Sequence, residues 1–484
     1  MNSTKQMQKV TGGGMRYIAA ITFVATLGGL LFGYDTAVIS GTVSSLKVVF
    51  INPYHWPETV ANSWHGLLVS SALIGCIIGG ISGGIVSLKM GRKRGLILAA
   101  IFFLISAIGS AMPEMFFRPI GTADHTFMAH FIFYRILGGI GVGLASMLSP
   151  MYIAEISPAK IRGKLVSWNQ FAIIFGMLVV YFVNYLIARQ GDDSWINHIG
   201  WRWMFASEVI PAVFFLVLLF FVPETPRYLA LKNRDEEALR ILTKINGSSV
   251  AGTIMTEIKE TLVSTSGKLF SFGFLVIIAG ILLAVFQQFI GINVVLYYAP
   301  EIFKNMGSGT NHSLLQTIIV GIINMSFTVL AIYTVDRFGR KQLQIIGALG
   351  MAFFMFVLGL AFFFDKLGIA AMIAMLGYVA CFAFSWGPVV WVLLSELFPN
   401  KVRGRAMAFA VGAMWISNLI VSWTFPIMNN STALTNLFHH GFAYWIYAIM
   451  GLLAAFFMWK LVPETKGKTL EEIEYFWKNK RKQV

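Results

Sequence analysis

The chain has 484 residues, of which 57% are hydrophobic and only 12% are charged, and its formal net charge is +15. A soluble protein needs about a quarter of its residues charged. The mean hydropathy of +0.72, with 42 phenylalanines and 46 glycines, is instead typical of membrane helices, which use aromatic residues at interfaces and glycine where helices pack closely. This composition predicts a polytopic membrane protein and excludes a secreted disulfide scaffold, a soluble oxidoreductase and a disordered adaptor.

A membrane span needs roughly 20 apolar residues, and runs of that kind predict an all-α fold of twelve transmembrane helices in two six-helix halves. The predicted spans are 17–40, 66–88, 95–112, 129–152, 165–187 and 203–222, followed by 272–296, 314–335, 342–364, 369–395, 406–427 and 442–462. The first run is too long, and too interrupted by Gly28, Gly33 and Asp35, to be the apolar core of a cleaved signal peptide. We therefore expect it to be a retained helix.

One long polar stretch divides the chain. We expect an N-terminal half over 1–222, a cytoplasmic helical linker over 223–271, a C-terminal half over 272–462 and a cytoplasmic tail over 463–484. Most of the 37 lysines and arginines fall in loops that lie on the same side as the N-terminus, and cytoplasmic loops carry the excess of these residues. Both termini are therefore predicted to be cytoplasmic, and the net charge does not indicate nucleic-acid binding.

The only cysteines, Cys76 and Cys381, lie inside apolar runs. Disulfides and zinc sites need cysteines in other settings, so neither is expected. No cofactor is implied.

Three short motifs occur in both halves in the same order. Gly91-Arg92-Lys93 recurs as Gly339-Arg340-Lys341, Glu155 before Arg162-Gly163 recurs as Glu396 before Arg403-Gly404, and Pro223-Glu224-Thr225 recurs as Pro463-Glu464-Thr465. A parallel repeat of two six-helix halves is expected of transporters that rock around a central site. A duplicated protein that transports nothing is the alternative. A channel is disfavoured, because no span has a filter-forming segment or a repeated series of charges.

Four longer motifs resemble the sugar porter branch of the major facilitator superfamily, and the resemblance covers essentially the whole chain. They are Pro223–Arg227, Gln287–Asn293, Asp336–Lys341 and Pro463–Gly467. The resemblance implies import of a monosaccharide with a proton by alternating access, with D-xylose as the best single candidate. It also implies a multi-pass protein of the bacterial inner membrane that functions as a monomer and is not an enzyme.

Asp35 in the first span and Arg135 in the fourth are charges within hydrocarbon, which are costly and usually functional. Desolvation disfavours a charged carboxyl and a nearby guanidinium favours it, so making and breaking this pair could switch Asp35 between binding and releasing a proton. By resemblance, porters with an acid at this position are proton-coupled. A purely structural ion pair is the alternative. Glu208 in the sixth span is a second candidate, or else a helix-locking hydrogen-bond partner.

A sugar has hydroxyls that amides can bind and apolar C–H faces that aromatic rings can cover. Gln287, Gln288 and Asn293 lie together in one glycine-containing, discontinuity-prone span. By resemblance, the sugar site also includes Gln170, Asn324, Trp391 and Trp415, with Phe32, Tyr297 and Gly387 nearby.

Two methionines depart from the family pattern. By resemblance, Met414 stands where family members that carry xylose or glucose have an amide, and Met177 stands where those that carry xylose have one. Each lost neutral hydrogen bond is worth about 0.5–1.5 kcal/mol, so we expect weaker affinity or a shifted preference at this site.

The charged motifs at the cytoplasmic end predict a network that latches the halves together in the outward-facing state and parts on inward opening. Its expected members are Arg92, Glu155, Arg162, Glu224, Arg227, Asp336, Arg340, Glu396 and Arg403. The N-terminal motif carries Leu88 where the family has an aspartate. The alternative is that these arginines only fix the topology.

Other functions remain open. They are transport of glucose, arabinose or another pentose or polyol, and uncoupled facilitated diffusion. A sugar sensor usually has a long cytoplasmic tail, and the tail here is short. Drug efflux predicts an apolar cavity instead of clustered amides.

Overall fold

The computed structural model describes residues 12–158, 161–263, 274–398 and 403–466, together with residues 472, 475 and 477. Every regular element in these residues is a helix, and twelve of the helices are long and apolar enough to cross a membrane. The predicted fold class is therefore confirmed. Each of the twelve predicted spans overlaps one of these helices.

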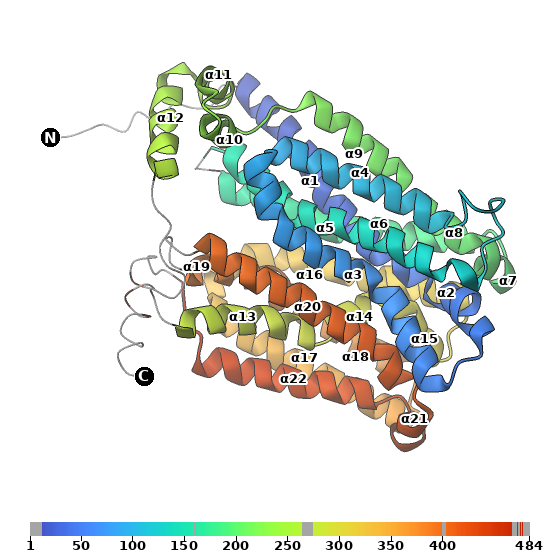
Figure 1. Ribbon diagram of the computed structural model, residues 1–484. Coiled ribbons are helices and arrows are strands. Elements are labelled where there is room, and N and C mark those ends of the chain that lie inside the picture. Colours follow the sequence, from blue (N-terminus) through green and yellow to red (C-terminus); the bar gives the residue numbers. More distant parts are fainter. Residues whose placement is uncertain are drawn as a thin grey trace.

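The first six spans form one bundle, which is the blue-to-green part of Figure 1. Its helices are α1 (Gly12–Val38), α3 (Glu58–Lys89), α4 (Arg92–Ala111), α5 (Met128–Ile156), α6 (Arg162–Ala188) and a sixth span built from α7 (Asp193–Trp195), α8 (Trp201–Ala206) and α9 (Val209–Phe221). Three linker helices follow, as expected for the polar stretch: α10 (Pro226–Leu231), α11 (Asp235–Asn246) and α12 (Ser248–Val263).

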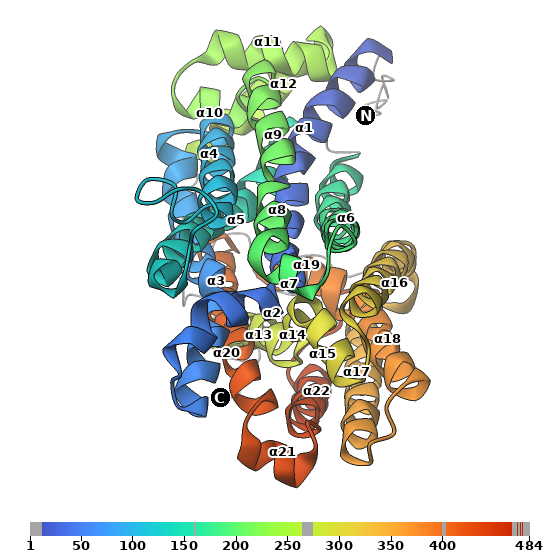
Figure 2. The same ribbon diagram turned by 90° about the vertical axis from the view of Figure 1, so that its right-hand side faces the viewer.

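The last six spans form the second bundle, coloured from yellow-green to red. They are α13 (Phe274–Phe289) with α14 (Ile292–Tyr297), α16 (Thr310–Phe338), α17 (Arg340–Phe363), α18 (Ile369–Phe384) with α19 (Trp386–Leu397), α20 (Arg403–Asn429) and α22 (Phe442–Lys460). Figure 2 shows the two bundles stacked against each other, with the linker helices at one end.

The start of α1 and the end of α22 lie at the same end of the molecule as the linker helices, and we call this the terminal end (Figure 1). The far end carries the short helices α2 (Val43–Leu46), α15 (Ala299–Asn305) and α21 (Thr432–Phe438). Helix α3 begins at Glu58, earlier than its apolar run predicted, directly after Pro57. Its first two turns are polar because they contact the other bundle instead of lipid.

Two spans of the second bundle are broken. Gly291 separates α13 from α14 with a φ of +91°, a backbone region that favours glycine, which confirms the predicted discontinuity. The break between α18 and α19 at Ser385 was not predicted. Pro388 explains it, because proline has no N–H to donate to the carbonyl four residues earlier, that of Phe384.

Glycines let α3 and α5 touch along their backbones. A Cβ atom on Gly75 would collide with the carbonyl oxygen of Ile136, and one on Gly139 would collide with that of Ala72. Small residues at such spacing allow close helix contact in membranes. This contact holds α5, and with it the functional residues described below, in a fixed position.

We expect Gly139→Ala to destabilise the protein, because overpacking at a rigid contact costs about 1–3 kcal/mol. Gly412→Ala in α20 is the matched control, since no atom lies within 4 Å of the added Cβ. Thermal unfolding of the detergent-purified variants checks this: the transition should fall by several degrees for Gly139→Ala and stay unchanged for Gly412→Ala. Equal transitions would show that the α3–α5 contact is not tight.

Candidate functional site

Asp35 of α1 and Arg135 of α5 form a buried ion pair in the first bundle. Arg135 Nη1 lies 2.7 Å from Asp35 Oδ1, and Nη2 donates to the Asp35 carbonyl oxygen at 3.1 Å. Both side chains are at most 1% exposed. The second carboxylate oxygen, Oδ2, is buried and accepts no hydrogen bond from an N–H or O–H donor of the described residues.

Glu208 lies beside this pair, between α8 and α9. It is fully buried, neither carboxyl oxygen accepts from an N–H group of the described residues, and its carboxyl is in side-chain hydrogen-bond contact with that of Asp35. The charged groups that act on it are Asp35 and Arg135. Two carboxyls thus share one guanidinium, and buried charges must be balanced. Such a cluster is neutral only when one carboxyl carries a proton. The structure therefore brings all three predicted acid and base residues together.

The predicted amides form a chain at the break in the seventh span. Asn293 Nδ2 donates to Gln288 Oε1 at 2.6 Å, and Gln288 Nε2 donates to Gln287 Oε1 at 3.4 Å. Gln287 Nε2 in turn donates to the carbonyl oxygen of Trp386 at 2.9 Å and faces that of Gly387 at 3.5 Å. The amides therefore connect the break before α14 to the break before α19.

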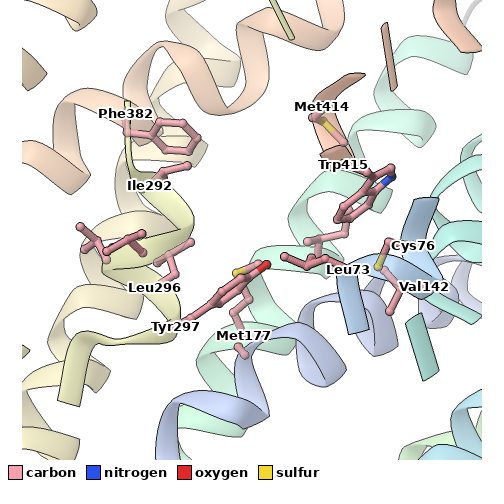
Figure 3. Close-up of a cluster of buried hydrophobic side chains, with 14 of the residues drawn as sticks. Leu73, Cys76, Val142, Met177, Ile292, Leu296, Tyr297, Phe382, Met414 and Trp415 are labelled. Carbon is pink, nitrogen blue, oxygen red and sulfur yellow. The ribbon is translucent and has the colours of Figure 1, made fainter. Parts of the chain in front are cut away.

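Aromatic residues from both bundles meet close to these amides. The ring of Phe32 on α1 lies 5.7 Å from that of Trp415 on α20, and the indole N–H of Trp415 is buried without a partner among the described residues. Asn418 Nδ2 lies 3.5 Å from the Tyr297 hydroxyl. Figure 3 shows Trp415, Met414, Tyr297 and Met177 in one buried cluster, with Leu73, Cys76 and Val142 of the first bundle.

The remaining predicted residues lie on the other helices of the two bundles. Gln170 is half-buried on α6, Asn324 is buried on α16 and Trp391 is half-buried on α19. Met177 and Met414 are both buried. The residues predicted to bind sugar thus come from both bundles.

At the terminal end, a carboxylate caps one helix in each bundle. Glu224 accepts hydrogen bonds from the backbone N–H groups of Arg92 at 3.1 Å and of Lys93 at 3.1 Å, at the start of α4. Glu464 accepts from those of Arg340 at 3.1 Å and Lys341 at 3.0 Å, at the start of α17. A helix start carries unpaired N–H groups and a partial positive charge, so both contacts are stabilising.

The same two helix starts carry an ion pair each. Arg92 Nη2 lies 2.7 Å from Glu155 Oε1, and Arg340 Nη2 lies 3.2 Å from Glu396 Oε1. Glycine precedes both arginines with a positive φ, +93° at Gly91 and +88° at Gly339, and a Cβ at Gly91 would collide with the Glu224 carboxylate. The repeated sequence motif is therefore a repeated structural unit.

The ion pairs show which members of the predicted network contact each other in this conformation. Glu155 pairs with Arg92, whereas Arg162 is exposed and reaches only the Ser157 carbonyl oxygen at 3.5 Å. Each of the two ion pairs lies within its own bundle, so neither of them joins the bundles in this conformation. Glu464 was not among the predicted members, although its repeat motif was a signal for it.

Three other predicted members complete the account of the network. Arg227 is half-buried on α10. Asp336 and Arg403 belong to α16 and α20, but their side chains lie outside the described residues.

The far end, in contrast, is joined across the bundles. Trp423 Nε1 donates to the Ser63 carbonyl oxygen at 2.9 Å, and Asn62 Nδ2 donates to that of Asn430 at 3.3 Å. The Tyr181 hydroxyl donates to the Leu296 carbonyl oxygen at 3.0 Å. The bundles are therefore closed on each other at the far end, while the ion pairs described at the terminal end stay within each bundle.

Comparison with known proteins shows where this architecture belongs. The family model described as "Sugar (and other) transporter" matches residues 21–477. The D-xylose-proton symporter of Escherichia coli (strain K12) is 61% identical over 478 residues, which cover 97% of each chain.

Two solved structures are also similar. The inward-open conformation of the xylose transporter XylE from E. coli matches with a TM-score of 0.87 and 60% identity, over 95% of this chain and 100% of that one. The major facilitator superfamily proton:xylose symporter XylE bound to 6-bromo-6-deoxy-D-glucose matches with a TM-score of 0.83 and 61% identity, over 96% and 100%. The chain belongs to the sugar transporter family of the major facilitator superfamily.

Proposed function

We propose that this protein imports D-xylose together with a proton by alternating access. The observation that carries the proposal is the buried cluster in which Asp35 and Glu208 share the guanidinium of Arg135. The identity of 61% with a D-xylose-proton symporter, over nearly the whole length of both chains, supports the same substrate pair.

The proton step follows from the charges of this cluster. In the present conformation the guanidinium of Arg135 lies 2.7 Å from the Asp35 carboxylate. A proton on Asp35 removes the charge that Arg135 neutralises, so the pair loosens and the guanidinium turns to Glu208. Proton binding and release thereby change the contact between α1 and α5, and Glu208 offers Arg135 a partner when Asp35 is protonated.

The sugar step uses residues from both bundles. The chain of amides formed by Gln287, Gln288 and Asn293 has donors and acceptors that can exchange their mutual hydrogen bonds for sugar hydroxyls, and Trp415 and Phe32 can cover an apolar sugar face. A sugar held from both sides favours the conformation in which the bundles are close together around it. Substrate binding thus lowers the free energy of the occluded state.

The moving parts follow the breaks in the helices. We propose that residues 1–222 and 272–462 rock as two units about the linker 223–271, while α14 swings at Gly291 to close over the sugar. The carboxylate caps on α4 and α17 keep each unit rigid during this motion. In the opposite conformation, the charged residues at the terminal end can approach one another across the bundles and act as the predicted latch.

We further propose that the terminal end is cytoplasmic, which the concentration of lysine and arginine in its loops supports. The closed far end then faces outward, and the conformation is inward-facing. The protein is proposed to act as a monomer in a bacterial inner membrane, with transport and no catalytic reaction.

Glucose or another monosaccharide is the second candidate substrate. Met177 and Met414 provide fewer hydrogen bonds for D-xylose than amides would, because a thioether is at most a weak hydrogen-bond acceptor for a hydroxyl.

Asp35→Asn should abolish accumulation of D-xylose against its gradient and leave sugar exchange intact, because asparagine cannot ionise. Uptake of labelled D-xylose into proteoliposomes with and without an inward proton gradient measures both. Asp124→Asn is the control, since Asp124 forms an exposed ion pair with Arg118 at the far end. Uphill accumulation by Asp35→Asn would contradict the assigned role of Asp35.

Met414→Gln should tighten D-xylose binding about two- to tenfold, the value of one added neutral hydrogen bond of about 0.5–1.5 kcal/mol. Met414→Leu, which adds no polar group, should leave the dissociation constant unchanged. Isothermal titration of the purified variants distinguishes these results. Unchanged affinity in Met414→Gln would mean that position 414 does not face the sugar.

A further inference from the structure

A fully buried histidine lies at the closed far end. His65, on the second turn of α3, has no exposed surface, and its Nε2 atom lies 3.1 Å from the carbonyl oxygen of Val43. A carbonyl oxygen can only accept, so Nε2 carries the hydrogen. The other ring nitrogen, Nδ1, is buried without a hydrogen-bond partner among the described residues. The ring is therefore neutral here, with an unused basic nitrogen.

This histidine lies on the seam between the bundles. The adjacent Gly66 packs closely against the backbone of Trp423 in α20. A Cβ atom added to Gly66 would collide with the carbonyl oxygen of Trp423. The charged groups that act on His65 are Glu301 of α15, from the second bundle, and Lys47 of the first. Oxygen Oε2 of Glu301 is also buried without a partner in the described residues.

A small cavity shares Val43 and Glu301 with the surroundings of the histidine, although His65 itself does not line it. Its volume is about 90 Å³, and its lining includes Val43, Ser44, Asp193, Glu301 and Lys304. The cavity has polar groups in its lining and is large enough for water, so water can come close to the Val43 and Glu301 side of the seam. Lys304 closes part of it by donating to the Ser44 hydroxyl across the bundles at 3.2 Å.

We propose that His65 is a second proton-binding site, which opens the far-end gate when it is protonated. A proton on Nδ1 places a cation and an unpaired N–H in a dry seam, and burying such groups costs several kcal/mol unless they are paired. Lys47 adds repulsion, and Glu301 offsets only part of the cost because its carboxylate is not hydrogen-bonded to the ring. Opening the gate transfers the ring to water and removes the cost.

This inference rests on the proposed alternating access and adds to it. Asp35 couples a proton to sugar movement at the centre of the molecule, whereas His65 responds to protons at the outer mouth. Acid outside the cell then favours the outward-open state, in which the empty transporter can take up its next substrates.

The test is a distance measurement across the gate. Spin labels on Val60→Cys and Leu437→Cys, exposed positions of α3 and α21, report the far-end separation after Cys76 and Cys381 are replaced by alanine. The measurement uses the full-length protein in lipid nanodiscs and in an Asp35→Asn background, which removes the titration of Asp35. Between pH 8 and pH 5.5 we expect the open-to-closed ratio to rise about fivefold, the change that a tenfold weaker proton affinity in the closed gate produces over this range.

His65→Gln should abolish this response, because its amide can still donate to Val43 but does not titrate. His198→Gln, at an exposed far-end histidine, should keep it. Glu301→Gln should also keep it, and a response lost in this variant would assign the proton to Glu301 and overturn the inference. A full response in His65→Gln would overturn it as well. Separations that never change with pH or with added D-xylose would contradict alternating access itself.

Discussion

The structure depends on the charge of Arg135, which must be neutralised because it is buried within the membrane-spanning part of the protein. Arg135 is buried in the middle of α5 and is tolerable there only because Asp35 of α1 neutralises it at 2.7 Å. The close packing of α3 on α5 through glycines holds the guanidinium in place, and Gly138 leaves room for the Asp35 carboxylate. Because Glu208 is a second acid at the same guanidinium, the cluster has one more carboxyl than it can keep ionised. We propose that proton coupling is a consequence of that imbalance.

The same two kinds of contact, a carboxylate cap and an arginine–acid pair, hold each bundle together at the starts of α4 and α17. Glu224 and Glu464 cap the starts of α4 and α17 with nearly identical geometry, and Arg92 and Arg340 each pair with an acid of their own bundle. Conformational change is therefore concentrated where the bundles meet. At the far end the contact between the bundles consists of a few hydrogen bonds, such as that from Trp423 to Ser63, and of closely packed backbones. These contacts can separate without unfolding either bundle.

Sequence reasoning predicted the twelve spans, the broken seventh span and the residues of the proton cluster, because hydropathy and buried charge are direct consequences of the membrane environment. It did not predict which acid pairs with which base. Glu155 is closer in sequence to Arg162 than to Arg92, and only the packing of α4 against α5 selects Arg92. The break at Ser385 had a signal in Gly387 and Pro388. No sequence signal indicated that His65 is buried, since a single histidine near the start of an apolar run is typical of a loop boundary. Only the structure shows that residues of α15 and α20 lie close to this part of α3.

The most direct test of proton-coupled D-xylose import is the external pH of lightly buffered, de-energised cells that express the protein. Adding D-xylose should make the medium alkaline, because each sugar that enters carries a proton with it, and cells with an empty vector should give no signal. Entry of labelled D-xylose without alkalinisation would contradict the account, since it would show a transporter in which the Asp35–Arg135–Glu208 cluster does not couple a proton to the sugar.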